Sequence, residues 1–121
     1  MVIAIDFDGT ITERNEFPYI GKLREHAVDA IKNIQAHGHK CVLWTCRYGI
    51  SLEAAKDRLK KEGITLDGYN ESLYSLPTRK IVADVYIDDR NVFMLGKVDW
   101  YEIEKYILSL DVPEVQIVKV E

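Results

Sequence analysis

Short apolar runs recur along the chain, and each is closed by polar or turn-forming residues. Val2–Ile5 and Val85–Ile87 are the clearest of these runs, and residues 41–44 form another. Such short apolar runs bounded by turn signals are typical of buried strands. Residues 67–70 read as a short extended segment, and the alternating sequence VQIVKV predicts an edge strand at residues 115–120.

The segments between these runs have apolar residues at the spacing of an amphipathic helix. This spacing predicts a helix over about residues 22–37, a second helix that Ser51 caps and Gly63 ends, and a third helix over residues 100–108. No apolar run approaches the roughly 20 residues of a membrane-spanning helix, so we expect no contact with a membrane.

The alternation of strands and helices predicts the fold class. We expect an α/β protein, a three-layer sandwich with a Rossmann-like, mostly parallel sheet and helices on both faces. The sequence shows no internal repeat, low-complexity segment or linker, so residues 1–121 are expected to form a single domain. In such folds ligands bind beyond the carboxyl ends of the strands.

Composition narrows the class of partner. Hydrophobic residues make up 47% and charged residues 30% of the chain, which is ordinary for a globular protein. A net charge of −4 gives no basic footprint for nucleic acid or an anionic membrane. The start of the chain has no leader pattern, and Cys41 and Cys46 lack metal-binding spacing. We therefore expect a reduced, cytoplasmic protein.

Acidic residues directly follow two of the predicted strands. Asp6 and Asp8 come after the first strand, and Asp88 and Asp89 come after Val85–Ile87. Caps or solvated loops would explain a single aspartate, but two acidic pairs after apolar strands favour a shared site. Carboxylates that converge at a sheet edge repel one another, and a hard divalent cation such as Mg²⁺ resolves that repulsion.

The motifs that contain these residues resemble those of the haloacid dehalogenase (HAD) superfamily. The sequence DFDGT, which begins at Asp6, resembles the first motif, DxDGT. The sequence LWTCR resembles the second, a strand that ends at Thr45. The sequence RKIVADVYIDDRN places Lys80 before the paired Asp88 and Asp89, as in the third and fourth motifs. The match is in order and covers most of the chain.

This resemblance implies a Mg²⁺-dependent phosphohydrolase that acts on phosphate monoesters. Asp6 would form an aspartyl phosphate, and Asp8 would act as general acid and then as general base. Thr45 and Lys80 would bind the transferring phosphoryl group. The implied metal ligands are Asp6, the backbone carbonyl of Asp8, Asp88 and Asp89. The resemblance leaves open whether Asp88 or Asp89 binds the metal directly.

The motif spacing leaves no room for a cap domain. The intervals from Asp6 to Thr45 and from Thr45 to Lys80 are largely used by a helix and a returning strand. We expect a minimal, capless member with an open site. Either a large substrate covers the site itself, or a neighbouring subunit of a homo-oligomer does so, or the selectivity is poor. The expected substrate is a phosphorylated small molecule or macromolecule. Arg47 is a candidate partner for an anionic group of the substrate. Further candidates are Tyr48, Asn70 and Glu71.

Two other functions stay open from the sequence. The protein could be a non-enzymatic phospho-acceptor, as receiver domains are, or a regulatory phosphate-binding protein that kept the fold without turnover. Receivers carry their acidic pair early and a lone phospho-accepting aspartate later. Here the DxD motif comes first, and Asp8 lies two positions after Asp6, which favours turnover.

Overall fold

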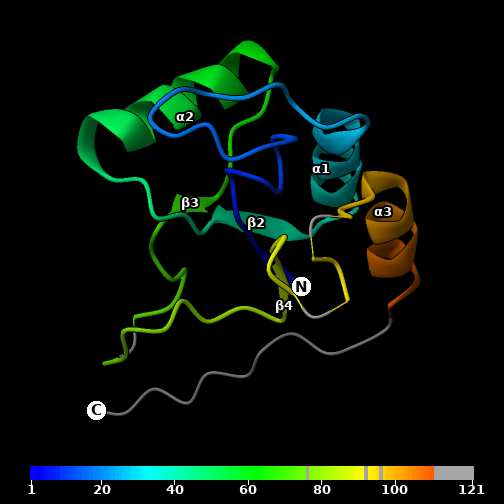
Figure 1. The fold of residues 1–121 in the computed structure, drawn as a ribbon. Coiled ribbons are helices and arrows are strands. Elements are labelled where there is room, and N and C mark those ends of the chain that lie inside the picture. The colour runs from blue at the N-terminus through cyan, green and yellow to red at the C-terminus, as the bar shows by residue number, and fades with distance from the viewer. Residues whose placement is uncertain (76, 92, 96, 111–121) are drawn as a thin grey trace.

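The computed structural model describes residues 1–75, 77–91, 93–95 and 97–110. Strands and helices alternate along this part of the chain, except that the last two strands follow each other without a helix between them (Figure 1). None of the described helices is both long enough and apolar enough to cross a lipid bilayer. The strand predicted at residues 115–120 lies outside the described part. The elements are β1 (Val2–Ile5), α1 (Ala27–Ala36), β2 (Lys40–Leu43), α2 (Gly49–Lys61), β3 (Gly68–Tyr69), β4 (Val85–Ile87) and α3 (Trp100–Ser109).

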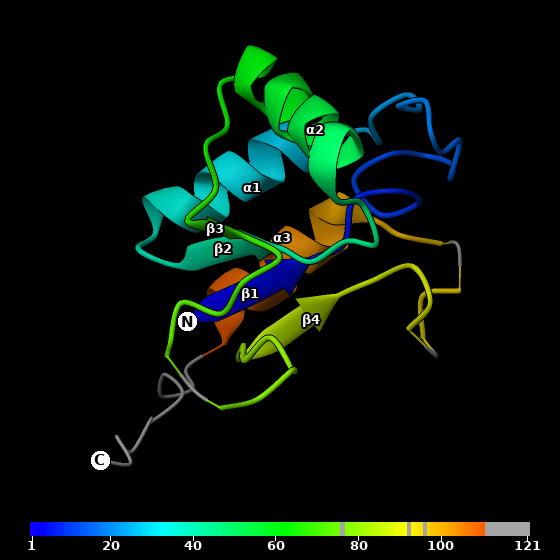
Figure 2. The same cartoon turned by 90° about the vertical axis from the view of Figure 1, so that its left-hand side faces the viewer.

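The four described strands form one parallel sheet in the order β3-β2-β1-β4. Ile5 of β1 lies opposite Leu43 of β2 and Ile87 of β4. All four residues of β1 are buried, as expected for a central parallel strand. Figure 2 shows β1 and β4 pointing to the same edge of the sheet. These features confirm the predicted Rossmann-like α/β class, without a cap domain among the described residues.

Helices α1 and α3 lie side by side and share one core with the sheet (Figure 1). Their buried residues recur three or four positions apart, so each helix presents one apolar stripe. Helix α2 adds Ala55 and Leu59 to the same core, so the three described helices pack on one face of the sheet and not on both faces as the sequence predicted. The core includes Ile3 and Ile5 of β1, Ile31 and Ile34 of α1, and Trp100, Ile103 and Ile107 of α3.

The other face of the sheet is covered by the chain that leads from β3 into β4. Tyr86 alternates with the core residues of β4 and therefore points to this face. Its ring packs edge-on against Trp44, with 5.4 Å between ring centroids, and its hydroxyl donates to the Ile81 carbonyl. The Asp84 carboxylate accepts a hydrogen bond from the Val2 N–H at 2.7 Å, which fixes the entry into β4 beside β1.

Helix α1 begins later than its sequence predicts. The apolar spacing extends back to about residue 22, but the helix starts at Ala27. Leu23 forms an isolated antiparallel bridge with Thr12, and His26 has a left-handed backbone with φ +66°. The pairing of Leu23 with Thr12 therefore replaces the helix that the local apolar pattern predicts before Ala27.

Two further boundaries differ from the prediction by small amounts. Helix α2 starts at Gly49, so Ser51 is its third residue and not its N-cap. The Ser51 hydroxyl still stabilises the helix start, because it accepts a hydrogen bond from the Tyr48 N–H at 3.2 Å. Strand β2 ends at Leu43, one residue earlier than predicted.

Truncation of a core side chain tests this packing. Ile31 is fully buried between α1 and the sheet, so Ile31→Ala should lower the free energy of unfolding by about 2–5 kcal/mol. Ile50 is 90% exposed, and Ile50→Ala should change it by less than about 0.5 kcal/mol. Urea unfolding followed by circular dichroism measures both, and equal effects would contradict the assigned core.

Candidate functional site

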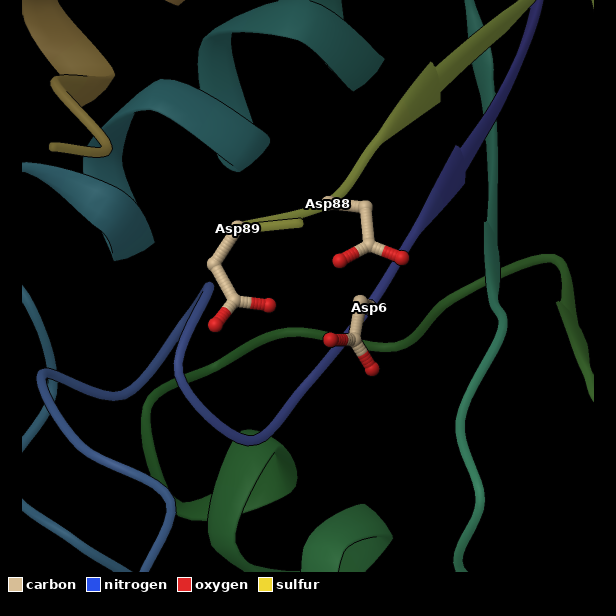
Figure 3. A group of neighbouring side chains, drawn as sticks. All are labelled: Asp6, Asp88 and Asp89. Carbon is tan, nitrogen blue, oxygen red and sulfur yellow. The ribbon is translucent and has the colours of Figure 1, made fainter. Parts of the chain in front are cut away.

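The carboxyl ends of β1 and β4 bring three aspartates together. Asp6 follows β1, and Asp88 and Asp89 follow β4. Because Ile5 and Ile87 are partners in neighbouring parallel strands, the residues after them leave the sheet side by side. One carboxylate oxygen from each aspartate lies within 4.8 Å of the others. Figure 3 shows the three side chains converging on a common point.

The turn after β1 fits closely around Asp89. Gly9 has φ +82°, and a Cβ at this position would lie 2.6 Å from Asp89 Oδ2, so only glycine suits it. The buried hydroxyl of Thr10 accepts a hydrogen bond from the Asp89 N–H at 2.9 Å and lies 3.3 Å from Asp6 Oδ2. Thr10 thus ties the two acidic segments together. Thr10 is the last residue of DFDGT, but its sequence position alone predicts no such role, because Asp89 lies far away along the chain.

Burial and mutual repulsion change the proton affinity of this cluster. Burial raises the pKa of Asp6 to about 7, and the charges of Asp88 and Asp89 contribute to this rise. Hydrogen bonds from the Phe7 N–H and the Thr10 hydroxyl act in the opposite direction. Burial and the adjacent Asp88 raise the pKa of Asp89 as well. A cation held between these oxygens would offset their repulsion. Carboxylate oxygens are ligands that Mg²⁺ prefers, so the donor set fits a divalent cation.

Asp8 forms a two-point ion pair with Arg47. Arg47 Nε donates to Asp8 Oδ2 at 2.7 Å, and Arg47 Nη2 donates to Asp8 Oδ1 at 2.8 Å. The other N–H groups of this arginine donate to the carbonyls of Pro18, Tyr19 and Ser51. The side chain is only 1% exposed. Arg47, expected to meet a substrate anion, thus uses all of its donors within the chain. It joins the loop at Pro18 and Tyr19 and the start of α2 to the DxD motif.

Thr45 lies at the carboxyl end of β2 and faces the same cleft as Asp6. Its N–H donates to Asn70 Oδ1 at 2.7 Å, and Asn70 Nδ2 donates to the Arg47 carbonyl at 2.8 Å. Asn70, a sequence candidate for recognition of the leaving group, therefore holds the loop after β2 in place. The Thr45 oxygen accepts from the Arg47 N–H at 3.2 Å, which leaves its hydroxyl hydrogen for a ligand.

The cleft above these residues has a volume of about 350 Å³. The structure brings most of the predicted site residues to it but places Lys80 elsewhere. Lys80 Nζ lies 5.3 Å from the centre of the Tyr86 ring, in a separate hollow beside Trp44 and Arg79. Lys80 belongs to the segment that packs beside Tyr86, and Trp44 lines both this hollow and the cleft. The predicted residues that line the cleft are Asp6, Asp8, Thr45, Asp88 and Asp89.

Fold and site together define a small α/β protein whose parallel sheet carries an acidic, candidate metal-binding group at its carboxyl edge. This arrangement is compatible with the HAD superfamily. The chain is similar to a solved structure described as that of a conserved protein from Bacteroides thetaiotaomicron, with 37% identity, 89% of each chain covered and a TM-score of 0.82. It belongs to the same family as that conserved protein. No family model and no curated protein matches it.

The ion pair of Arg47 generates a stability prediction. Arg47→Met leaves the carboxylate of Asp8 and several carbonyls without partners, so it should lower the free energy of unfolding by about 3–5 kcal/mol. The exposed Arg79 provides a matched control, and Arg79→Met should have little effect. Chemical unfolding measures both variants, and equal stabilities would contradict the structural role of Arg47.

The raised pKa of Asp6 generates a pH prediction for the metal-free protein. The pKa rises from an ordinary 3.8 to about 7 on folding, so the stability from this group is present below about pH 4 and is lost as pH rises toward 7. Asparagine at position 6 cannot ionise, so Asp6→Asn removes this loss of stability. The substitution should therefore raise the free energy of unfolding more at pH 8 than at pH 5. Urea unfolding in a chelator, with the exposed Asp57→Asn as control, measures the difference. A larger gain in stability at pH 5 than at pH 8 would contradict a raised pKa of Asp6.

Proposed function

We propose that this protein is a Mg²⁺-dependent phosphohydrolase of the HAD type that acts on phosphate monoesters. The observation that carries the proposal is the convergence of Asp6 with Asp88 and Asp89 in a cleft that Thr45 also lines. The order of these residues along the chain supports it, because it matches the order of the four HAD motifs. Phosphoryl transfer depends mainly on positioning and charge neutralisation, which such a cluster is suited to provide.

Asp6, Asp88 and Asp89 would hold the metal through carboxylate oxygens, and the resemblance adds the backbone carbonyl of Asp8. Both Asp88 and Asp89 reach the common point, so both are candidates for direct ligation. When bound, Mg²⁺ would neutralise charge on the phosphoryl oxygens and favour the ionised form of Asp6.

Asp6 would act as the nucleophile. Its carboxylate oxygen would form a bond to phosphorus while the bond from phosphorus to the leaving oxygen breaks, which yields an aspartyl phosphate. Water would then attack phosphorus and release inorganic phosphate and the free carboxylate. The Thr45 hydroxyl, whose hydrogen has no other assigned partner, would donate to a phosphoryl oxygen in both steps.

Asp8 would handle the proton, giving it to the leaving oxygen in the first step and taking one from water in the second. Its side chain is 10% exposed and lines the cleft, so substrate can reach it. Arg47 occupies one lone pair on each Asp8 oxygen, and a carboxylate offers about four acceptor sites. The ion pair therefore fixes the orientation of Asp8 and leaves acceptor sites for the reaction.

A second candidate function is phosphate binding or phospho-acceptance without turnover. One observation favours it: Lys80, the cation that the resemblance assigns to phosphoryl transfer, lies outside the cleft. A site without that charge would stabilise the transition state less well. The two candidates differ in whether phosphate is released or stays on Asp6.

Hydrolysis of p-nitrophenyl phosphate tests the leading proposal. We expect release of phosphate that requires Mg²⁺ and falls to background in Asp6→Asn, because the amide cannot act as the nucleophile. Asp57→Asn, on the exposed face of α2, makes the same chemical change away from the site and should keep wild-type activity.

Two outcomes separate the candidates. Release by Asp6→Asn at the wild-type rate would contradict a covalent mechanism through Asp6. No release by the wild type, together with stable labelling of Asp6 by a small acyl phosphate, would favour the phospho-acceptor.

A further inference from the structure

We propose that Arg90 binds the phosphate group of the substrate, in the place that the sequence suggested for Lys80 and Arg47. The inference rests on the proposed function, since it concerns the phosphate ligand of the same cleft. Arg90 follows the Asp88–Asp89 pair directly and lines the cleft together with Thr45.

The charge of the cleft creates the need for a further cation. Four carboxylates line it, and a phosphate group would add more negative charge. A divalent cation offsets two of the carboxylate charges, and Arg47 offsets that of Asp8. The cleft would therefore stay negative before phosphate enters. A cation at its wall lowers the electrostatic cost of bringing the anion in.

Arg47 and Lys80, the two basic residues that the sequence suggested, are both unsuited to this role. Every N–H of Arg47 already donates within the chain, so a substrate contact would break a buried hydrogen bond. Lys80 lies over the Tyr86 ring in a hollow that the acidic cluster does not line.

Arg90 has the free donors that the other two lack. Its side chain is exposed, and its guanidinium makes no ion pair or hydrogen bond with any residue that the structure describes. Its backbone is fixed, because the Arg90 N–H donates to Asp88 Oδ1 at 2.9 Å. The positive charge is close enough to act on Asp89, where it opposes the rise in pKa.

The guanidinium matches the geometry of phosphate. Its planar set of N–H groups can donate to two phosphoryl oxygens at once, which an ammonium group cannot do with the same fixed geometry. Arg90 next to the metal-binding pair would thus contact oxygens of the same phosphoryl group that Thr45 contacts. Arg90→Lys should accordingly bind the phosphate group more weakly than the wild type but more tightly than Arg90→Met.

Steady-state kinetics with p-nitrophenyl phosphate and Mg²⁺, and inhibition by inorganic phosphate, test this role. Arg90→Met should raise both KM and the inhibition constant of phosphate by about tenfold or more, because a charge-assisted contact is lost. Its melting temperature should match that of the wild type, since the side chain is exposed. Arg79→Met removes an exposed cation from the neighbouring hollow and should leave both constants unchanged.

The contrary results are equally specific. Unchanged constants in Arg90→Met, or a loss in Lys80→Met with none in Arg90→Met, would overturn the assignment. A wild type without any hydrolysis would count against the proposed function, and direct titration of inorganic phosphate in the presence of Mg²⁺ would then test Arg90. Weaker binding in Arg90→Met supports its role; equal binding, or no binding to the wild type, overturns it.

Discussion

Repulsion among carboxylates that the strand register forces together is the constraint on which the rest of the site depends. The pairing of β1 with β4 places Asp6 beside Asp88, whatever the loops do. The surrounding residues accommodate this crowding. Gly9 lets the turn pass close to Asp89. The Thr10 hydroxyl donates to Asp6 and accepts from the Asp89 N–H. Binding of a cation between these carboxylates would stabilise the fold, and this would link the architecture to the proposed chemistry.

The Arg47–Asp8 ion pair connects the DxD motif to the neighbouring segments of the chain. Through carbonyls in the segment before α1 and at the start of α2, one buried guanidinium connects the DxD motif to the walls of the cleft. Asn70 extends this framework from the end of β3 to the loop after β2. These hydrogen bonds hold Asp8 and the backbone of Thr45 in place at the cleft. Arg90 lines the cleft and is exposed, which suits a residue proposed to meet an incoming phosphate.

The sequence predicted the four described strands, the parallel sheet and the acidic ends of β1 and β4, because short apolar runs and the residues that close them are local signals. The role that the resemblance assigns to Lys80 stays a prediction. The structure places this residue over the Tyr86 ring, outside the cleft, and nothing local in the sequence shows that its segment packs there. The free donors of Arg90 and the full engagement of Arg47 were likewise hidden, because both depend on contacts between segments far apart in the chain. The start of α1 was missed for the same reason.

The most direct test of the central claim is calorimetric titration of the metal-free protein with Mg²⁺. We expect a single site per chain in the wild type, affinity at least about tenfold lower in Asp88→Asn, and unchanged affinity in Asp57→Asn. Absence of binding to the wild type, or undiminished binding to Asp88→Asn, would contradict the claim that the three aspartates form a metal site.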